Sequence, residues 1–338
     1  MISAKMRIGL IGAGAIAGTY AQAFKNSATA ELVGVTDARI DAARTIGDQL
    51  GCPAFDCYEA MCEATGCEAA VVATPPDTHA TISCWLLARD IHVLCEKPLA
   101  ISPQEAHAMV AAVERSRATL RMASKFRYVR DVIEARAIVA SGQIGEVILF
   151  ENAFTSRVEM KNRWNSDPVV SGGGVLIDNG THSVDLMRYF LGPIAEIQVV
   201  EGLRVQDIPV EDTVRVFVRS KAGVMGTIDL SWSINKELPY YLSVYGSKGT
   251  LHVGWKESKF RCQGDTEWRV FGRGYDKLQA FGSKLDNFVR SIRQQESPLI
   301  SLQDAVASVE VINAAYDAMW RAKWALVASD LSQSATIG

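Results

Sequence analysis

A glycine-containing turn near the start of the chain restricts its fold more than any other feature. The apolar, β-compatible residues Arg7 to Ile11 come before it, and the alanine-rich, helical stretch Ala15 to Asn26 comes after it. The turn itself, Gly12-Ala13-Gly14-Ala15-Ile16-Ala17, has the G-x-G-x-x-A form of a dinucleotide-binding fingerprint. This order of strand, turn and helix predicts the first unit of a doubly wound parallel sheet.

The small residues of this turn each serve the binding of a dinucleotide. Gly12 permits the tight turn, Gly14 lets the backbone approach a pyrophosphate, and Ala17 lets the helix pack closely on its strand. Ala15 and Ile16 begin the helix, whose first N–H groups lack helical partners and carry a partial positive charge. We expect these groups to face the phosphates of the cofactor.

A carboxylate after the second expected strand favours NAD over NADP. Asp37 follows Glu31 to Thr36, about twenty residues beyond the glycines, where it can hydrogen-bond the adenosine ribose hydroxyls. Its charge would repel the additional phosphate of NADP. Arg39, two residues further on, could stack on adenine or neutralise that phosphate. We therefore expect NAD, with NADP as the less favoured cofactor.

The first 124 residues alternate strand and helix signals, which is typical of a Rossmann domain. Ser102 stands where it can cap the last of these helices. Further strands are predicted at Glu31–Thr36, Ala69–Ala73, Ile91–Cys95 and Leu120–Ser124, and further helices at Ile40–Leu50, His79–Ala88 and Pro103–Arg115.

Beyond residue 125 strand signals follow one another with few helices, which predicts a C-terminal α/β domain with a large, mostly antiparallel open sheet. Strands are predicted at Val147–Phe154, Ile197–Val205, Val214–Arg219, Gly223–Ser233, Tyr241–Tyr245 and Thr250–Val253, and helices at Val132–Ser141, Asp178–Leu191, Lys284–Arg293 and Leu302–Trp324. We therefore divide the chain into a dinucleotide-binding domain, residues 1–124, and a substrate-binding and oligomerisation domain, residues 125–338. The C-terminal helices can pack back on the first domain.

The composition excludes several classes of protein. The 338 residues carry a net charge of −3 without a basic run, which argues against nucleic-acid binding. No apolar run reaches the roughly 18 residues of a membrane helix, and no secretory signal is evident, so we expect a cytoplasmic protein. Four cysteines recur every five residues, but zinc ligands come in closer pairs, so no metal is expected. These cysteines are Cys52, Cys57, Cys62 and Cys67.

Three further motifs stand in order along the chain. They are Ala73-Thr74-Pro75-Pro76-Asp77-Thr78-His79, Cys95-Glu96-Lys97-Pro98, and Gly172-Gly173-Gly174-Val175-Leu176-Ile177-Asp178-Asn179-Gly180-Thr181-His182. With them the chain resembles the glucose–fructose oxidoreductase / inositol dehydrogenase / rhizopine catabolism superfamily over nearly its whole length. The resemblance implies a nicotinamide-dependent oxidoreductase acting on a sugar, cyclitol or related polyol.

The resemblance also assigns residues to the cofactor site. Thr74, Pro75 and His79 match family positions that lie along the cofactor. Glu96 and Lys97 end an expected strand, at the edge where an open α/β sheet places its ligand. A residue before proline is held extended, which would aim the Lys97 side chain.

Lys97, Asp178 and His182 are the candidate catalytic residues. Asp178 and His182 are four residues apart and share one face if this stretch is helical, while the preceding glycines can let the chain approach the site closely. His182 titrates near neutral pH and can take a proton, and Lys97 can stabilise a developing alkoxide. Asp178 is expected to orient the substrate and the imidazole. Either Lys97 or His182 could transfer the proton.

Other polar residues are expected to face the substrate. Lys125 and Arg127 follow the last Rossmann strand, and Arg163 and Trp164 precede the glycine cluster. Their charges would suit hydroxyl-rich or carboxylated substrates. Many relatives carry asparagine and arginine near Lys125 to Arg127, so this part of the pocket differs from theirs.

Two alternative functions are compatible with the predicted fold. A glycoside-cleaving enzyme that retains its NAD, or a non-catalytic sugar sensor, could use the same fold.

A homodimer or homotetramer is expected on the open face of the C-terminal sheet, because exposed apolar positions need covering. The positions assigned to that face are Val214, Val216, Val218 and Ile228.

Overall fold

In the computed structural model, which describes residues 4–321, six parallel strands form the N-terminal sheet in the order β3-β2-β1-β4-β5-β6. This is the strand order of a Rossmann domain, with its topological switch between β1 and β4. The strands are β1 (Met6–Ile11), β2 (Ala30–Thr36), β3 (Ala54–Phe55), β4 (Ala69–Val72), β5 (His92–Glu96) and β6 (Leu120–Ala123), and the helices are α1 (Ala17–Asn26), α2 (Ile40–Leu50), α3 (Tyr58–Thr65), α4 (His79–Leu87) and α5 (Pro103–Glu114).

Helices cover both faces of this sheet, as its strand sequences require. Successive residues of β4 point to opposite faces, so Val71 packs with α1 and α2 while Val72 packs with α3, α4 and α5. Ser102 caps α5 as expected, since its hydroxyl accepts a hydrogen bond from the N–H of Glu105 at 3.3 Å.

The second sheet has eight strands in the order β14-β13-β12-β11-β7-β10-β9-β8. Only β7 and β10 pair in parallel, so the sheet is mostly antiparallel. The strands are β7 (Val147–Thr155), β8 (Ile194–Glu201), β9 (Thr213–Ser220), β10 (Met225–Ser231), β11 (Tyr240–Gly246), β12 (Gly249–Gly254), β13 (Ser258–Cys262) and β14 (Arg269–Gly272), with helices α6 (Arg130–Ala140), α7 (Pro168–Ser171), α8 (Val175–Leu191), α9 (Lys277–Ile292) and α10 (Leu302–Arg321). The fold class predicted from the sequence is confirmed.

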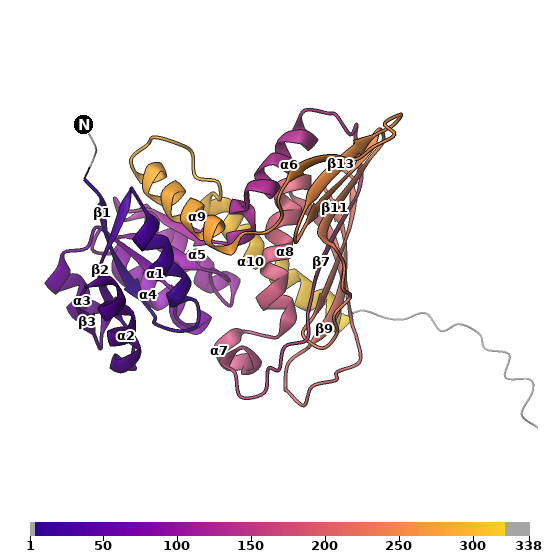
Figure 1. Cartoon of the computed structure of the whole chain (residues 1–338). Coiled ribbons are helices and arrows are strands. Elements are labelled where there is room, and N and C mark those ends of the chain that lie inside the picture. Colours follow the sequence, from indigo (N-terminus) through magenta and orange to yellow (C-terminus); the bar gives the residue numbers. More distant parts are fainter. Residues whose placement is uncertain (1–3, 322–338) are drawn as a thin grey trace, which may run out of the picture.

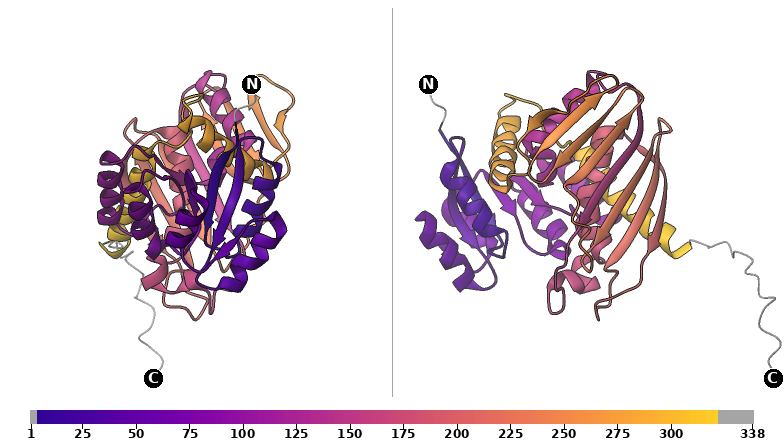
Figure 2. Two further views of the ribbon diagram at one scale, coloured as in Figure 1. Left: turned by 90° about the vertical axis from the view of Figure 1, so that its left-hand side faces the viewer. Right: turned by 45° about the vertical axis from the view of Figure 1, so that its right-hand side comes forward.

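Helices lie on one face of the eight-stranded sheet, and the other, bare face carries no helix of residues 4–321 (Figures 1 and 2). The apolar positions assigned to the open face from the sequence point instead into the core beneath α8. Val214, Val216, Val218 and Ile228 are all buried there. The open face carries the alternate residues, among them Arg215, Phe217 and Met225.

Helices α9 and α10 return to the Rossmann domain, where α9 lies beside α1 (Figure 1). Phe281 and Phe288 of α9 join the core around Tyr20 and Phe24, while Val309 of α10 joins the core on the other face of the sheet. The two domains therefore share packed cores along this contact.

Several boundaries differ from those expected. Strands β3, β13 and β14 and helices α3 and α7 had no predicted counterpart. Helix α1 begins at Ala17 rather than Ala15, α8 at Val175 rather than Asp178, and α9 at Lys277 rather than Lys284. The end of the predicted helix Leu302–Trp324, with residues 1–3 and 322–338 of the assigned domains, lies outside the described residues. No helix within residues 4–321 has the length and apolar character needed to cross a membrane.

Candidate functional site

A cavity of about 590 Å³ lies where the carboxyl ends of the Rossmann strands face helix α8. It includes the switch between β1 and β4, where open α/β sheets bind their ligands. Its lining residues are Gly12, Gly14, Ala15, Ile16, Asp37, Arg39, Ala73, Thr74, Pro75, Pro76, Glu96, Lys97, Lys125, Phe126, Phe154, Thr155, Ser156, Trp164, Asn165, Asp178, Asn179, His182, Trp255 and Phe281.

The glycine turn at one end of the cavity has the geometry of a phosphate site. Gly12 has a φ of 102°, and a Cβ there would lie 2.6 Å from the carbonyl oxygen of Ala73. A Cβ on Gly14 would meet no atom within 4 Å, so the backbone is open to a ligand on this side. Among residues 4–321, the N–H groups of Gly14, Ala15 and Ile16 have no hydrogen-bond acceptor. They can therefore bind a pyrophosphate.

Asp37 stands beside this turn and is tied to it. One carboxylate oxygen accepts a hydrogen bond from the N–H of Ala13 at 2.8 Å, and the other accepts one from the N–H of Arg39 at 2.9 Å. The Arg39 guanidinium lies 3.4 Å from the same carboxylate and is otherwise largely exposed. The oxygen that faces Arg39 also accepts a hydrogen bond from its Nε–H at 3.4 Å, whereas the oxygen bound to Ala13 retains a lone pair for a ribose hydroxyl.

His79 lies behind the cavity rather than in it. Thr74 and Pro75 line the cavity, whereas His79 is buried, with Nδ1 2.8 Å from the carbonyl oxygen of Pro98 and Nε2 2.9 Å from that of Thr74. Burial lowers its pKa, so the neutral ring donates to one of these carbonyls at a time. His79 therefore links the loop after β4 to the loop after β5. Its side chain does not line the cavity, so it does not take the expected place beside the cofactor.

Glu96 is held by partners from two distant elements. It accepts hydrogen bonds of 2.7 Å from the Tyr20 hydroxyl and from Nζ of Lys284, whose side chain is 0% exposed. Burial raises the pKa of Glu96, but Lys284, the Tyr20 hydroxyl and the charge of Lys97 together lower it by more, so the net direction is down. The carboxylate is thus charged and already paired with Lys284.

Lys97 and Asp178 meet across the two domains. Nζ of Lys97 donates to the carboxylate of Asp178 and, at 3.1 Å, to the backbone carbonyl of the same residue. The Lys97–Pro98 peptide bond is cis. The ion pair joins the end of β5 to the first turn of α8 and fixes the ammonium inside the cavity.

His182 is 5% exposed and lies one helical turn after Asp178. Its Nδ1 is 3.2 Å from the hydroxyl of Ser124, and its ring meets Phe126 edge to face at a centroid distance of 5.0 Å. Asp178, which we expected to orient this imidazole, is instead paired with Lys97, and Ser124 takes that place. Burial, and then the nearby lysines, lower the pKa of His182 well below 6.5, so the ring is neutral at pH 7.

Of the four further polar residues expected to face the substrate, two line the cavity and two, Arg127 and the exposed Arg163, do not. Lys125 and Trp164 are part of its wall. The assignment of Arg127 to the substrate is wrong, because its side chain is 3% exposed and its two terminal nitrogens are bound elsewhere. It donates to the carboxylate of Asp185 at 2.5 Å and to that of Asp304 at 3.2 Å, behind the site.

The aromatic wall was not anticipated from the sequence. Phe126 and Phe154 stack with a centroid distance of 4.4 Å, and Trp255 packs edge to face on Phe126 at 6.3 Å. Phe126 lies in η2 (Lys125–Tyr128), Phe154 in β7, and Trp255 directly after β12. Of these three aromatic residues, only Phe154 belongs to a predicted strand, where the alternation of side chains could have indicated that it points inward.

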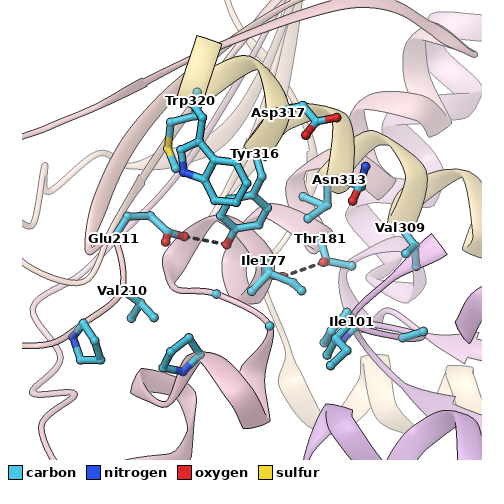
Figure 3. A pocket seen from close by; sticks show the side chains of 18 of the residues that line it. Ile101, Ile177, Thr181, Val210, Glu211, Val309, Asn313, Tyr316, Asp317 and Trp320 are labelled. Carbon is cyan, nitrogen blue, oxygen red and sulfur yellow. Dashed lines mark hydrogen bonds between the residues drawn. The ribbon is translucent and has the colours of Figure 1, made fainter. Parts of the chain in front are cut away.

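A second cavity of about 460 Å³ lies on another side of α8, seen in Figure 3. Gly172 and Gly173 line it, and a Cβ on Gly173 would lie 1.9 Å from the hydroxyl oxygen of Tyr316. That hydroxyl donates to Glu211 at 2.8 Å, and Glu211 also accepts from the N–H groups of Gly174 and Leu176. The glycines therefore let the start of α8 pass beneath Glu211 and Tyr316, and their expected role at the cofactor cavity is wrong.

The regularly spaced cysteines do not gather into a site. Among residues 4–321, no group of three or more potential ligands is placed to hold a metal ion. Cys62 and Cys67 are buried, with their sulfur atoms 3.6 Å apart, while Cys57 is exposed.

The chain matches two domain models of one family. The oxidoreductase family with an NAD-binding Rossmann fold matches residues 6–124, and the GFO/IDH/MocA C-terminal domain matches residues 132–252. The chain is 26% identical over 323 residues to the rhizopine catabolism protein MocA of Rhizobium meliloti, across 94% of this chain and 96% of that protein. It is 26% identical over 310 residues to myo-inositol 2-dehydrogenase of Thermotoga maritima, across 88% of this chain and 92% of that protein. Levoglucosan dehydrogenase, solved with NADH and levoglucosan, has a similar fold, with a TM-score of 0.87 and 19% identity over 94% of this chain and 98% of that one. The chain therefore belongs to the GFO/IDH/MocA family of oxidoreductases with an NAD-binding Rossmann fold.

Proposed function

We propose that the protein is an NAD-dependent dehydrogenase that transfers a hydride between nicotinamide and a hydroxyl or carbonyl carbon of a sugar, cyclitol or related polyol. One observation carries this proposal: Lys97, Asp178 and His182 line the same cavity as the dinucleotide turn. The relatives support the substrate class, since they include a myo-inositol 2-dehydrogenase and a levoglucosan dehydrogenase.

The residues of the cavity fit NAD. The N–H groups of Gly14, Ala15 and Ile16 would hold its pyrophosphate, and Asp37 its adenosine ribose. Thr74 and Pro75 would flank it at the end of β4. When bound, its nicotinamide ring accepts the hydride released by the substrate carbon.

We assign proton transfer to His182 and charge stabilisation to Lys97. If Nδ1 carries the hydrogen and donates it to Ser124, Nε2 of the neutral ring is left to accept the substrate hydroxyl proton. The Lys97 ammonium, oriented by Asp178, can donate a hydrogen bond to the same oxygen as negative charge develops. Asp178 acts as a positioning residue for Lys97.

A panel of sugars, cyclitols and polyols tests this function. Dialysed protein is mixed with NAD and each compound, and NADH is followed by its absorbance. We expect NADH formation with at least one polyhydroxylated compound and none without it. Complete inactivity across the panel, with NAD shown to be bound, would count against the proposal.

The pH dependence of oxidation should follow His182. Because the folded pKa of His182 lies well below 6.5, the neutral, proton-accepting form persists below that pH. We expect kcat/KM for oxidation to stay level as pH falls to 6.5 and to decline only at lower pH. An acidic limb centred at or above pH 6.5 would contradict the assignment of this buried histidine as the base.

Asp37 should set the cofactor preference. Its carboxylate would hydrogen-bond the ribose of NAD and repel the added phosphate of NADP, so kcat/KM should be higher with NAD. In Asp37→Ala this preference should shrink by roughly tenfold or more, the effect of one hydrogen bond to a charged group. Arg39→Ala is the matched variant, and it should weaken NADP use more than NAD use. Equal values of kcat/KM with NAD and NADP in the native protein would show that the Arg39 charge cancels the effect of the Asp37 carboxylate on cofactor preference.

We further propose a homodimer or homotetramer that uses the bare face of the C-terminal sheet. Phe217 is 41% and Met225 55% exposed on this face, where a partner would cover them. Light scattering at micromolar concentration should give at least twice the chain mass. Phe217→Glu combined with Met225→Glu should reduce that mass, whereas Leu203→Glu, in an exposed loop, should not. A measured mass equal to that of one chain for the native protein would contradict the proposed oligomer.

A further inference from the structure

Lys125 is a cation of the cavity without a carboxylate partner. It begins η2 directly after β6 and lines the cavity together with Lys97 and His182. Its Nζ lies 5.1 Å from the centre of the Phe126 ring and 5.8 Å from that of Tyr275. Within residues 4–321 the Lys125 ammonium forms no hydrogen bond or ion pair with a side chain, and aromatic rings attract a cation less strongly than a carboxylate does.

The acidic groups near Lys125 are already paired with other residues. Glu96 is bound by Lys284, and Asp178 by Lys97. Burial lowers the pKa of Lys125 to about 8, and the charge of Lys97 adds to this effect. Together with Lys284, which is buried behind the wall, these five groups carry one more positive charge than negative charge, and the cation without a paired carboxylate is Lys125.

The position of Lys125 separates it from the phosphate end of the cavity. The turn that fits the pyrophosphate follows β1, whereas Lys125 follows β6, three strands away in the order β1-β4-β5-β6. At about 4.8 Å per strand, the two strand ends are roughly 14 Å apart. Lys125 is therefore on the His182 and Lys97 side, where the substrate is expected.

We propose that Lys125 binds an oxyanion of the substrate, so that the enzyme prefers a sugar or polyol that carries a carboxylate or a phosphate. The inference rests on the proposed function and narrows its substrate class. A substrate oxyanion supplies the missing partner of Lys125 through a charge-assisted hydrogen bond. Lys97 and His182 then remain free to act on the hydroxyl that is oxidised.

Matched pairs of acidic and neutral sugars test this inference. The pairs are D-glucuronate with D-glucose, D-galacturonate with D-galactose, and D-glucose 6-phosphate with D-glucose. Binding to the NAD-loaded protein is measured by calorimetry, which needs no turnover, and kcat/KM is measured wherever NADH forms. The uronate pairs and the phosphate pair show which oxyanion the site prefers.

We expect the native protein to bind at least one acidic member roughly 10- to 100-fold more tightly than its neutral partner. Lys125→Met keeps the length of the side chain and removes its charge, so it should abolish this difference by weakening the acidic member far more than the neutral one. Lys25→Met, on the exposed side of α1, is the matched control and should retain the preference.

Three results would overturn the inference. They are an absence of acidic preference in every pair, an equal loss for the acidic and neutral members in Lys125→Met, and a loss of NAD affinity in that variant, which would assign Lys125 to the cofactor. Acidic preference in binding without NADH formation from any compound would instead overturn the proposed dehydrogenase function and leave the oxyanion site standing.

Discussion

Lys97→Ala and His182→Ala should each lower turnover by roughly two to four orders of magnitude, the usual contribution of positioned proton transfer and charge stabilisation. His182 meets the cavity from α8 of the second domain, so its loss should change NAD affinity little. Lys97 ends β5 near the cofactor, and its loss can disturb both cofactor and substrate. Turnover is measured as initial NADH formation with saturating NAD and an accepted substrate.

Controls separate a catalytic effect from a loss of structure. The exposed Lys161→Ala should turn over at the native rate. Asp178→Asn should cost less than Lys97→Ala, because it removes only a positioning contact. The double variant Lys97→Ala/His182→Ala should show a smaller fold-decrease in turnover than the product of the two single fold-decreases, since both residues act on one oxygen. Near-native turnover in His182→Ala would leave Lys97 as the remaining candidate for proton transfer.

Arg127→Met should destabilise the folded protein by about 3–5 kcal/mol, the range for removing one partner of a buried ion pair. Asp185 is 0% exposed, and burial already raises its pKa even with the Arg127 charge beside it. Without Arg127 the carboxylate must remain buried without its cation or become protonated. The free energy of unfolding from urea denaturation measures the loss.

Two further variants identify the ion pair as the cause. Arg127→Met combined with Asp185→Leu removes both charges, so most of the stability should return. Arg117→Met breaks an exposed pair with Asp90 and should leave the urea midpoint almost unchanged. If the double variant were as unstable as Arg127→Met alone, packing of the arginine side chain would be the main contribution instead.

The sequence predicts the local parts of this molecule well. The turn Gly12 to Ile16 stands between a strand and a helix as predicted, although the helix begins two residues later, because tight turns depend on residues that are adjacent in the chain. The start of α9 was missed although its signal was local. Asp276 caps this helix by accepting a hydrogen bond from the N–H of Gln279 at 3.0 Å.

The sequence predicts less where a residue depends on partners far along the chain. The pairing of Glu96 with Lys284 joins residues 188 positions apart, and no pattern around Lys284 marks it as buried. Arg127 was assigned to the substrate because charge at a strand end usually faces a ligand, whereas Asp185 and Asp304 draw it into the interior. The open sheet face was misassigned because the apolar half of an alternating strand faces the covering helix.

The stoichiometry of NADH tests the central claim most directly. Dialysed protein is given excess NAD and a limiting amount of a sugar, polyol or glycoside that it is shown to bind, and both NADH and the sugar products are quantified at completion. Hydride transfer from substrate to nicotinamide predicts equal amounts of NADH formed and substrate oxidised. Cleaved sugar without accumulation of NADH would show a glycoside-cleaving enzyme that retains its cofactor, and bound but unchanged sugar would show a sensor; either result contradicts the proposed dehydrogenase.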